Sequence, residues 1–110
     1  MPRAYTASRL EFQNRRFRGT GGVSANNREV GFRPAFIDHS TGIIYCSRNP
    51  DGTLAPCHRL DGLPPELVEA RDAEGRVTAL KGSVEAGFVR NGLFFSREEA
   101  AAAVAREKPV

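Results

Sequence analysis

The sequence predicts an α+β protein with a small, mostly antiparallel sheet of about five short strands and a C-terminal helix packed on one face. From residue 31 onward, short apolar runs alternate with turn signals, as expected of paired strands. The Asn91-Gly92 pair lies between two such runs and indicates a tight hairpin. An alanine-rich segment near the C-terminus has a strong helix propensity. The length of 110 residues is that of one domain.

Charge divides the chain into two predicted parts, a basic flexible arm at 1–30 and a single α+β domain at 31–110. Residues 1–33 hold seven arginines against two glutamates, a net charge of +5, whereas the remainder holds nine basic and eleven acidic groups, a net charge of −2. The arm shows no sustained helix or strand period, and its end, GTGGVSANN, has the composition of a linker. We expect this segment to be disordered or to lie on the domain through Phe12 and Phe17.

The first predicted hairpin joins the runs PAFID and IIYCS through the turn HSTG. Asp38 can accept a hydrogen bond from a backbone N–H two residues on, and Gly42 can adopt the positive φ that closes the loop. The NPDG tetrapeptide at 49–52 then fits a type I turn. We expect TLAPCH to be the return strand, and Pro56 marks it as an edge strand or a short one.

The middle of the chain predicts two turns around short elements. Pro65 suits the first turn of a short helix over PELVEA, and 72–75 has the composition of a turn. We expect Asp61 to brace a loop. RVTALKGSV is expected to be a strand that breaks or bulges at Gly82.

The last segment predicts a hairpin that leads directly into a helix. Asn91-Gly92 suits a two-residue type I′ turn, because both residues tolerate positive φ. Ser96 and Glu99 form a capping box ahead of a helix at 97–107. The expected buried stripe of this helix is Ala100, Ala101, Val104 and, at its margin, Ala105. The expected core consists of Phe36, Ile37, Ile44, Leu54, Val77, Leu80, Phe88, Val89, Phe94 and Val104.

Residues 38–62 contain both histidines and both cysteines, so any catalytic or metal site is expected there. The Asp-His-Ser run at 38–40 does not predict a catalytic triad, since three consecutive side chains in a tight turn diverge. We interpret the run as a turn. No catalytic residue and no cofactor is predicted.

The metal alternative uses His39, Cys46, Cys57 and His58, whose two nitrogens and two thiolates are the donor set of a structural zinc site. Their spacing lacks the usual pair of cysteines two to four residues apart. We therefore expect no metal ligands and two thiols in a reducing compartment. A zinc site and a disulfide between the cysteines remain alternatives.

The arginine cluster NRRFR is the strongest binding signal in the chain. Guanidinium groups beside an aromatic ring contact phosphates, stack on exposed bases or dock on acidic protein surfaces. The predicted nucleic-acid or partner-binding residues are Arg9, Arg15, Arg16, Phe17 and Arg18.

From residue 31, the pattern GFRPAFID, DGTLAP, HRLDGLP and AGFVRNGLFFSREEAA resembles that of small uncharacterised bacterial proteins. The ending GFVRNGLFFSREEA is similar to one in short phage- and prophage-linked proteins. This resemblance covers roughly the last eighty residues and implies one folded unit, with no activity, cofactor or catalytic residue attached to it.

These observations lead us to expect a non-enzymatic protein-binding or accessory module of a bacterium or phage. A nucleic-acid-binding protein that uses the arginine-rich arm and a structural zinc-binding domain are the two alternatives. Another protein or a second copy is the expected partner, with a homodimer formed through an exposed strand edge. No apolar run approaches the roughly 20 residues of a membrane helix, and no signal peptide is apparent, so we expect a cytoplasmic protein without membrane contact.

Overall fold

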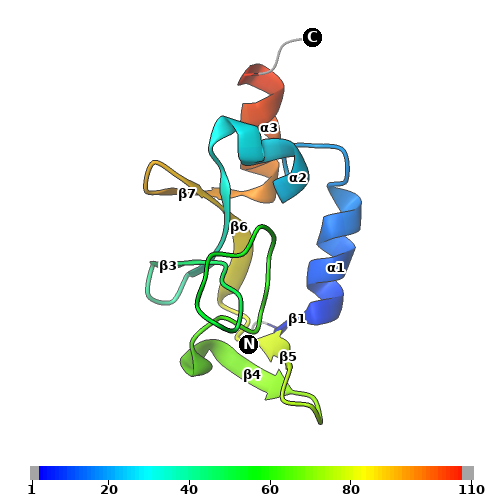
Figure 1. Ribbon diagram of the computed structural model, residues 1–110, viewed down its shortest axis with the longest axis vertical. Helices are drawn as coiled ribbons and strands as arrows, with labels where there is room; N and C mark the ends of the chain where they lie inside the picture. The colour runs from blue at the N-terminus through cyan, green and yellow to red at the C-terminus, as the bar shows by residue number, and fades with distance from the viewer. Residues whose placement is uncertain (1–2, 108–110) are drawn as a thin grey trace.

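The computed structural model describes residues 3–107, so the outermost residues of the predicted arm and domain lie outside it. The described chain is an α+β fold with two antiparallel sheets (Figure 1). A four-stranded sheet occupies the middle of the molecule, a three-stranded sheet lies at one end, and the C-terminal helix lies at the other. The prediction of an antiparallel α+β fold is confirmed, but the single five-stranded sheet is wrong.

The four-stranded sheet has the order β3-β2-β6-β7. Its strands are β2 (Arg33–Asp38), β3 (Ile43–Cys46), β6 (Val84–Arg90) and β7 (Leu93–Ser96). β2 pairs with β3 on one side and with β6 on the other, so Phe36 lies between Tyr45 and Ala86. Both predicted hairpins are therefore confirmed, and the long-range β2–β6 pairing joins them into one sheet.

The turns of these hairpins follow the predicted turn chemistry. Asp38 Oδ1 accepts a hydrogen bond from Ser40 N at 2.9 Å, and Gly42 N donates to Asp38 O at 2.7 Å. Asn91 and Gly92 have φ values of 54° and 77°, as a type I′ turn requires.

The three-stranded sheet has the order β1-β5-β4 and includes a strand from the predicted arm. It consists of β1 (Tyr5–Thr6), β4 (Val68–Arg71) and β5 (Val77–Leu80). The predicted strand is broken at Gly82 rather than bulged, because a turn closed by the hydrogen bond from Val84 N to Lys81 O separates β5 from β6. The two strands therefore belong to different sheets.

Two predictions for the middle of the chain need correction. TLAPCH contributes only an isolated bridge between Arg48 and Leu54, because Pro56 has no N–H to donate to a longer ladder. The predicted PELVEA helix is a 3₁₀ turn, η2 (Pro65–Leu67), and the chain then extends directly into β4. The type I turn at 49–52 is confirmed by the bond from Gly52 N to Asn49 O at 2.9 Å.

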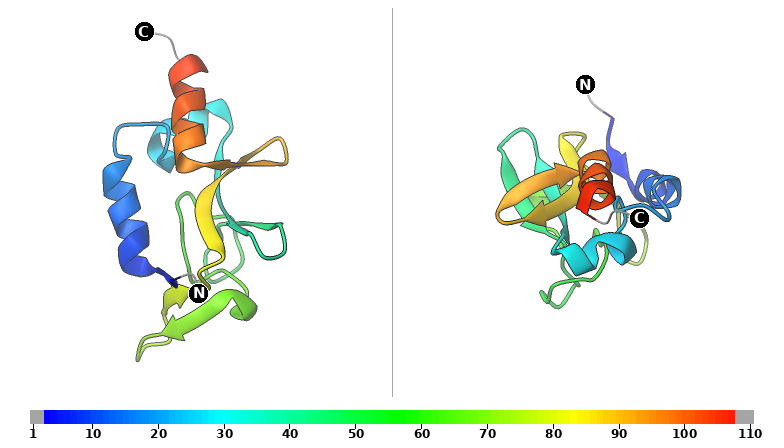
Figure 2. Two further views of the ribbon diagram at one scale, coloured as in Figure 1. Left: turned by 180° about the vertical axis from the view of Figure 1, so that it is seen from behind. Right: turned by 90° about the horizontal axis from the view of Figure 1, so that it is seen from above.

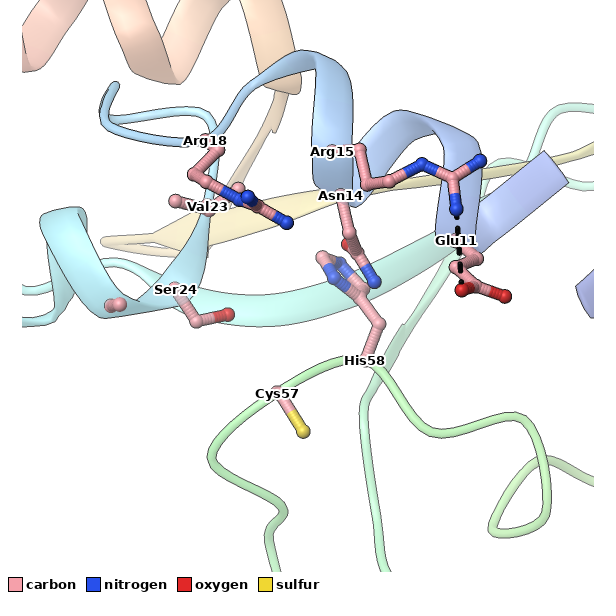
Figure 3. Close-up of a pocket in the computed structure, with 9 residues that line it drawn as sticks. Glu11, Asn14, Arg15, Arg18, Val23, Ser24, Cys57 and His58 are labelled. Carbon is pink, nitrogen blue, oxygen red and sulfur yellow. Dashed lines mark hydrogen bonds and ion pairs between the residues drawn. The ribbon is translucent and has the colours of Figure 1, made fainter. Parts of the chain in front are cut away.

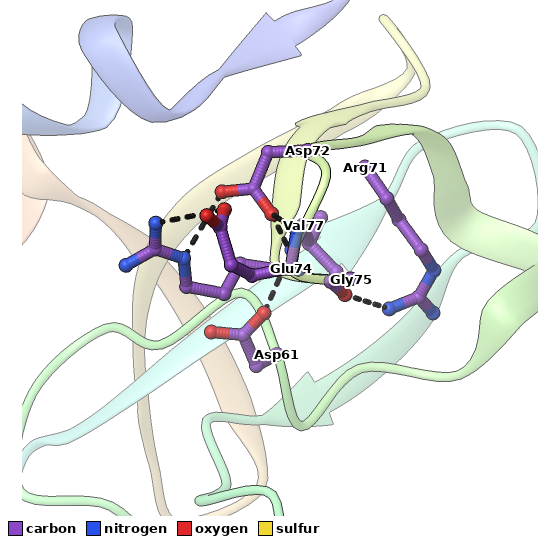
Figure 4. Close-up of polar contacts among 7 residues, drawn as sticks. Asp61, Arg71, Asp72, Glu74, Gly75 and Val77 are labelled. Carbon is purple, nitrogen blue, oxygen red and sulfur yellow. Dashed lines mark hydrogen bonds and ion pairs between the residues drawn. The ribbon is translucent and has the colours of Figure 1, made fainter.

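Carboxylates hold the β4–β5 hairpin and the loop next to it (Figure 4). Gly75 N donates to Asp72 O at 3.0 Å, and Arg76 Nε donates to Asp72 Oδ2 at 3.0 Å. Asp61 Oδ1 accepts from Val77 N at 2.7 Å and so ties the preceding loop to β5. The predicted turn and the bracing role of Asp61 are both confirmed.

The segment predicted to be a flexible arm forms regular structure. Its helices are α1 (Ala7–Arg16), α2 (Ser24–Asn27) and the 3₁₀ turn η1 (Arg28–Val30). Thr6 caps α1 by accepting a hydrogen bond from Arg9 N at 3.1 Å. Tyr5 and Leu10 are buried and anchor the segment, whereas Phe12, a predicted anchor, is exposed. Phe17, the other predicted anchor, is partly buried beside the Gly22 backbone, which belongs to the N-terminal segment itself.

Buried side chains form two clusters, one at each end of β6. The larger cluster contains Tyr5, Leu10, Phe36, Leu60, Leu63, Leu67, Val77, Leu80, Val84 and Ala86. The smaller contains Phe32, Phe88, Ala100, Ala103 and Val104. Of the ten predicted core residues, Phe36, Val77, Leu80, Phe88 and Val104 are buried. Leu54 was wrongly placed in the core, because the strand predicted to hold it does not form.

α3 (Arg97–Glu107) begins at the predicted residue and packs on the smaller cluster. Figure 2 shows this helix at the end of the molecule opposite the three-stranded sheet. The capping box is confirmed, since Glu99 N donates to Ser96 Oγ at 3.1 Å and Ser96 N donates to Glu99 Oε1 at 2.8 Å. The buried face of the helix comprises Arg97, Ala100, Ala103 and Val104, so Ala101 and Ala105 were wrongly assigned to it. The presence of a buried arginine is the main departure from the predicted stripe.

The glycine-rich link between α1 and α2 lies directly against α3. A Cβ atom at Gly21 would lie 2.4 Å from Val104 Cβ, and one at Gly22 would lie 2.6 Å from Phe17 Cδ1. Only glycine permits this approach, which brings the first helix close to the last. Within residues 3–107, no helix is long and apolar enough to cross a membrane.

We predict that Ser96→Ala lowers the free energy of unfolding by about 1 kcal/mol, because the N-cap hydrogen bond to Glu99 N is lost. Urea unfolding monitored by circular dichroism measures this change. Ser8→Ala, at an exposed position within α1, is the matched control and should be neutral or slightly stabilising. Equal losses in both variants would contradict the capping role.

Candidate functional site

A groove lies between α1, the start of α2 and the loop at 55–58 (Figure 3). We call it the arginine groove, and its volume is about 420 Å³. It is lined by Glu11, Asn14, Arg15, Arg18, Val23, Ser24, Ala25, Cys57 and His58. The groove therefore exists only because the N-terminal segment folds onto the body.

Helical periodicity sorts the side chains of α1 and its C-terminal turn into three faces. The inward face carries Leu10, Gln13 and Phe17. The groove face carries Glu11, Asn14, Arg15 and Arg18. The outer face carries Arg9, Phe12 and Arg16. Basic side chains thus occupy both faces that do not pack inward.

The structure separates the five predicted binding residues into two groups. Arg15 and Arg18 line the arginine groove. The Arg9 guanidinium group lies 5.4 Å from the centroid of the Tyr5 ring. That of Arg16 lies 5.6 Å from the centroid of the Phe17 ring. Phe17 is the packing partner of Arg16 and lines no part of the groove.

The charge of the groove is positive. Among residues 3–107, Glu11 is the one carboxylate that lines it, and this group pairs with Arg15 Nη1 at 3.3 Å. The guanidinium group of Arg18 takes part in none of the hydrogen bonds or ion pairs found among residues 3–107, and Figure 3 shows its side chain extending toward Asn14. A ligand that enters the groove therefore meets at least one guanidinium group without a partner.

Arg97, at the start of α3, lies behind the inner wall of the groove and is only 3% exposed. Its Nη1 donates to Gly22 O at 2.8 Å, and its Nη2 donates to Asn14 Oδ1 at 2.6 Å. Nη2 also lies 3.4 Å from His58 Nδ1. The sequence analysis missed Arg97. The sequence signal for Arg97 is its distance of three residues from Ala100 and seven from Val104, which places all three on one helical face.

His58 forms part of the inner wall and is held in one orientation. Its Nε2 lies 2.6 Å from Gly87 O. A carbonyl oxygen can only accept a hydrogen bond, so Nε2 carries the proton and Nδ1 is the acceptor that faces Arg97. The ring packs edge-on against Phe36 and Phe88, at centroid distances of 5.2 and 5.1 Å. Desolvation, followed by repulsion from the Arg97 charge, lowers the pKa of His58 to about 3. The imidazole is neutral at physiological pH.

The Asp-His-Ser run at 38–40 is a turn, as predicted. Asp38 Oδ1 accepts hydrogen bonds from the backbone N–H and the hydroxyl of Ser40, at 2.9 and 2.7 Å. These bonds lower the pKa of Asp38. His39 Nε2 instead pairs with Glu85 at 2.8 Å, so the three side chains do not form a relay.

The four side chains of the zinc alternative do not meet. The His58 ring is turned toward Gly87 and the aromatic side chains, whereas His39 pairs with Glu85 in another part of the sheet. Throughout residues 3–107, no three histidine, cysteine, aspartate or glutamate side chains are grouped so as to hold a metal ion. Cys46 and Cys57 are free thiols, so the disulfide alternative is not formed either.

No protein-family model matches the chain, and comparison with curated proteins and with solved structures gives no significant match. The functional assignment therefore depends on the geometry and charge of the chain's own side chains. Among these, the arginine groove combines a concave surface, uncompensated positive charge and fixed hydrogen-bond donors.

We predict that the free energy of unfolding decreases as the pH falls from about 6.5 toward 3. The unfolded state takes up a proton on His58 in this range and the folded state does not, so the limiting slope is about 1.4 kcal/mol per pH unit. The contribution of neutral His58 to the free energy of unfolding is fully present above the ordinary histidine pKa of 6.5. Urea unfolding at pH values from about 7 to 5 measures the slope, because this range lies above the ordinary pKa values of carboxyl groups.

His58→Gln should flatten this dependence, because the group that takes up the proton is removed. His39→Gln, which removes the histidine at an exposed position, is the control and should keep the wild-type slope. Identical slopes for His58→Gln and the wild type would show that His58 is not held neutral by the fold.

Proposed function

We propose that the protein is a non-enzymatic binding module, a cytoplasmic accessory protein of a bacterium or phage, that docks an acidic segment of a partner protein in the arginine groove. The observation that carries the proposal is the charge of the groove. Arg15 and Arg18 line it, Arg97 lies behind it, and Glu11 is the one lining carboxylate. An acidic chain matches this surface, and complementary charge favours both encounter and register.

The state of His58 supports binding rather than catalysis. A general base needs a pKa near the working pH and a nitrogen that faces the substrate. The pKa of His58 is about 3, and both of its nitrogens face groups of the protein itself. The histidine thus contributes shape and orientation to the groove, as expected of a docking surface.

A second candidate, nucleic-acid binding, is favoured by one feature of the outer face of α1. Phe12 is 56% exposed, shares the outer face of α1 with Arg9 and Arg16, and lies between them along the helix axis. An exposed ring flanked by guanidinium groups can stack on an unpaired base while the arginines contact phosphates. This surface is separate from the arginine groove, so the two candidates call for different variants.

We predict that Arg15→Gln/Arg18→Gln weakens binding of a glutamate-rich peptide about tenfold, since two solvent-exposed ion pairs, each worth up to about 1 kcal/mol, are lost. Fluorescence anisotropy of a labelled peptide of about twelve residues measures the affinity. The charge-matched control is Arg48→Gln/Arg71→Gln, whose arginines bond to Gly52 O and Gly75 O in distant turns. We expect the control to bind within about twofold of the wild type, because salt screens its remote charges.

A labelled oligothymidylate of similar length, titrated at two salt concentrations, tests the second candidate. Tighter, strongly salt-dependent binding that is lost in Arg9→Gln/Arg16→Gln but kept in Arg15→Gln/Arg18→Gln would favour nucleic acid and contradict the docking of an acidic peptide.

A further inference from the structure

Arg97 is a buried cation that has no carboxylate partner. None of the ion pairs formed among residues 3–107 includes Arg97. Burial lowers the pKa of the Arg97 guanidinium group, and the interaction with Tyr5 offsets part of this effect. Buried charges in proteins are ordinarily paired with an opposite charge. The positive charge of Arg97 is therefore available to an anion that comes close to it.

The hydrogen bonds of Arg97 leave this charge uncompensated. Its acceptors include the carbonyl oxygen of Gly22, the amide oxygen of Asn14 and the imidazole nitrogen of His58, which are all neutral. The Tyr5 hydroxyl, which also interacts with Arg97, is neutral as well, because burial raises its pKa to about 12. The Nε of Arg97 has no hydrogen-bond partner among the described residues. Two of these acceptors, Asn14 and His58, line the arginine groove, so the guanidinium group lies directly behind the inner wall.

The same bonds determine what the wall presents to a ligand. Since Asn14 Oδ1 accepts from Arg97, the Nδ2 group is the end of the amide that remains for the groove. The Ser24 hydroxyl and the Arg18 guanidinium add further donors around the groove (Figure 3). The one lining carboxylate, on Glu11, is already paired with Arg15. The lining of the groove thus offers hydrogen-bond donors from Asn14, Arg18 and Ser24.

The number of uncompensated charges indicates which anion fits. Arg15 is balanced by Glu11, whereas Arg18 and Arg97 are both without a carboxylate partner among residues 3–107. Two free positive charges match a phosphate monoester, which carries a charge near −2 at neutral pH and has three acceptor oxygens. A side-chain carboxylate carries a single charge and two oxygens.

We propose that the inner end of the arginine groove is a phosphate site, in which Asn14 Nδ2 and Arg18 contact the oxygens and Arg97 supplies positive charge from behind. The partner is then a phosphorylated acidic segment of a protein. This inference rests on the docking role proposed above and specifies the group that anchors the segment. The Arg97 guanidinium is a positioning group, since it acts through the Asn14 amide.

The test is a nuclear magnetic resonance titration of the ¹⁵N-labelled full chain with four probes. These are inorganic phosphate and three forms of one glutamate-rich peptide, which carry phosphoserine, serine or glutamate at the central position. We expect the phosphoserine peptide to bind at least tenfold more tightly than the glutamate form. We also expect phosphate and the phosphopeptide to shift the side-chain resonances of Asn14 and Arg18.

Asn14→Asp is the decisive variant. It places a carboxylate at the acceptor position 2.6 Å from Arg97 Nη2, so the protein supplies its own counter-charge and loses the amide donor. We expect phosphate affinity to fall at least tenfold while the melting temperature stays equal or rises. Asn91→Asp, which makes the same charge change in a turn that accepts Asp-Gly, is the control and should bind as the wild type does.

The outcomes separate this inference from the docking role. Equal binding of the phosphoserine and glutamate peptides overturns the phosphate site and leaves the docking role intact. Phosphate binding that Asn14→Asp retains also overturns the site. Binding of inorganic phosphate without binding of any peptide supports the site and contradicts the protein partner. If no probe shifts the groove resonances, both proposals are wrong.

Discussion

The buried guanidinium group of Arg97 is the contact on which the arrangement of the chain depends. From the first turn of α3 it reaches the glycine link through Gly22 O, α1 through Asn14 and the loop at 55–58 through His58. His58 is in turn bonded to Gly87 in the middle of β6. A single side chain therefore connects the N-terminal segment, the C-terminal helix and the central sheet. Hydrogen bonds that involve a charged group are each worth roughly 1.5–3 kcal/mol, enough to order a short helix.

The functional surface is a consequence of this contact. α1 buries little apolar area, with Leu10 as its one buried residue, so its position depends on polar bonds as well as packing. Those bonds join the two sides of the groove, because Asn14 belongs to α1 and His58 to the loop. The same guanidinium group, because its acceptors are neutral, gives the inner wall its positive charge. Structure and proposed function thus depend on the same atoms, and a buried charge that is costly for folding is retained where an anion can use it.

Local signals in the sequence predicted the local structure. Turn chemistry at Asn91-Gly92 and the capping box of Ser96 and Glu99 specified the last hairpin and the start of α3, because these interactions span only a few residues. Contacts between distant segments were not predictable in this way. The separation into two sheets depends on one turn after β5, and the groove brings together residues 14, 58 and 97. Arg15 and Arg18 were identified by composition. The local spacing that places Arg97 on the buried face of α3 did not indicate that this residue and His58 would lie beside α1.

Amide hydrogen exchange in Arg97→Met tests the central role of Arg97 most directly. The substitution keeps an unbranched side chain while it removes the charge and every donor. The account predicts that the amides of residues 10–16 lose at least about tenfold in protection, whereas those of β2 and β6, which pair with each other, keep most of theirs. Unchanged protection throughout α1 would show that apolar packing alone holds the helix, and the role assigned to Arg97 would be contradicted.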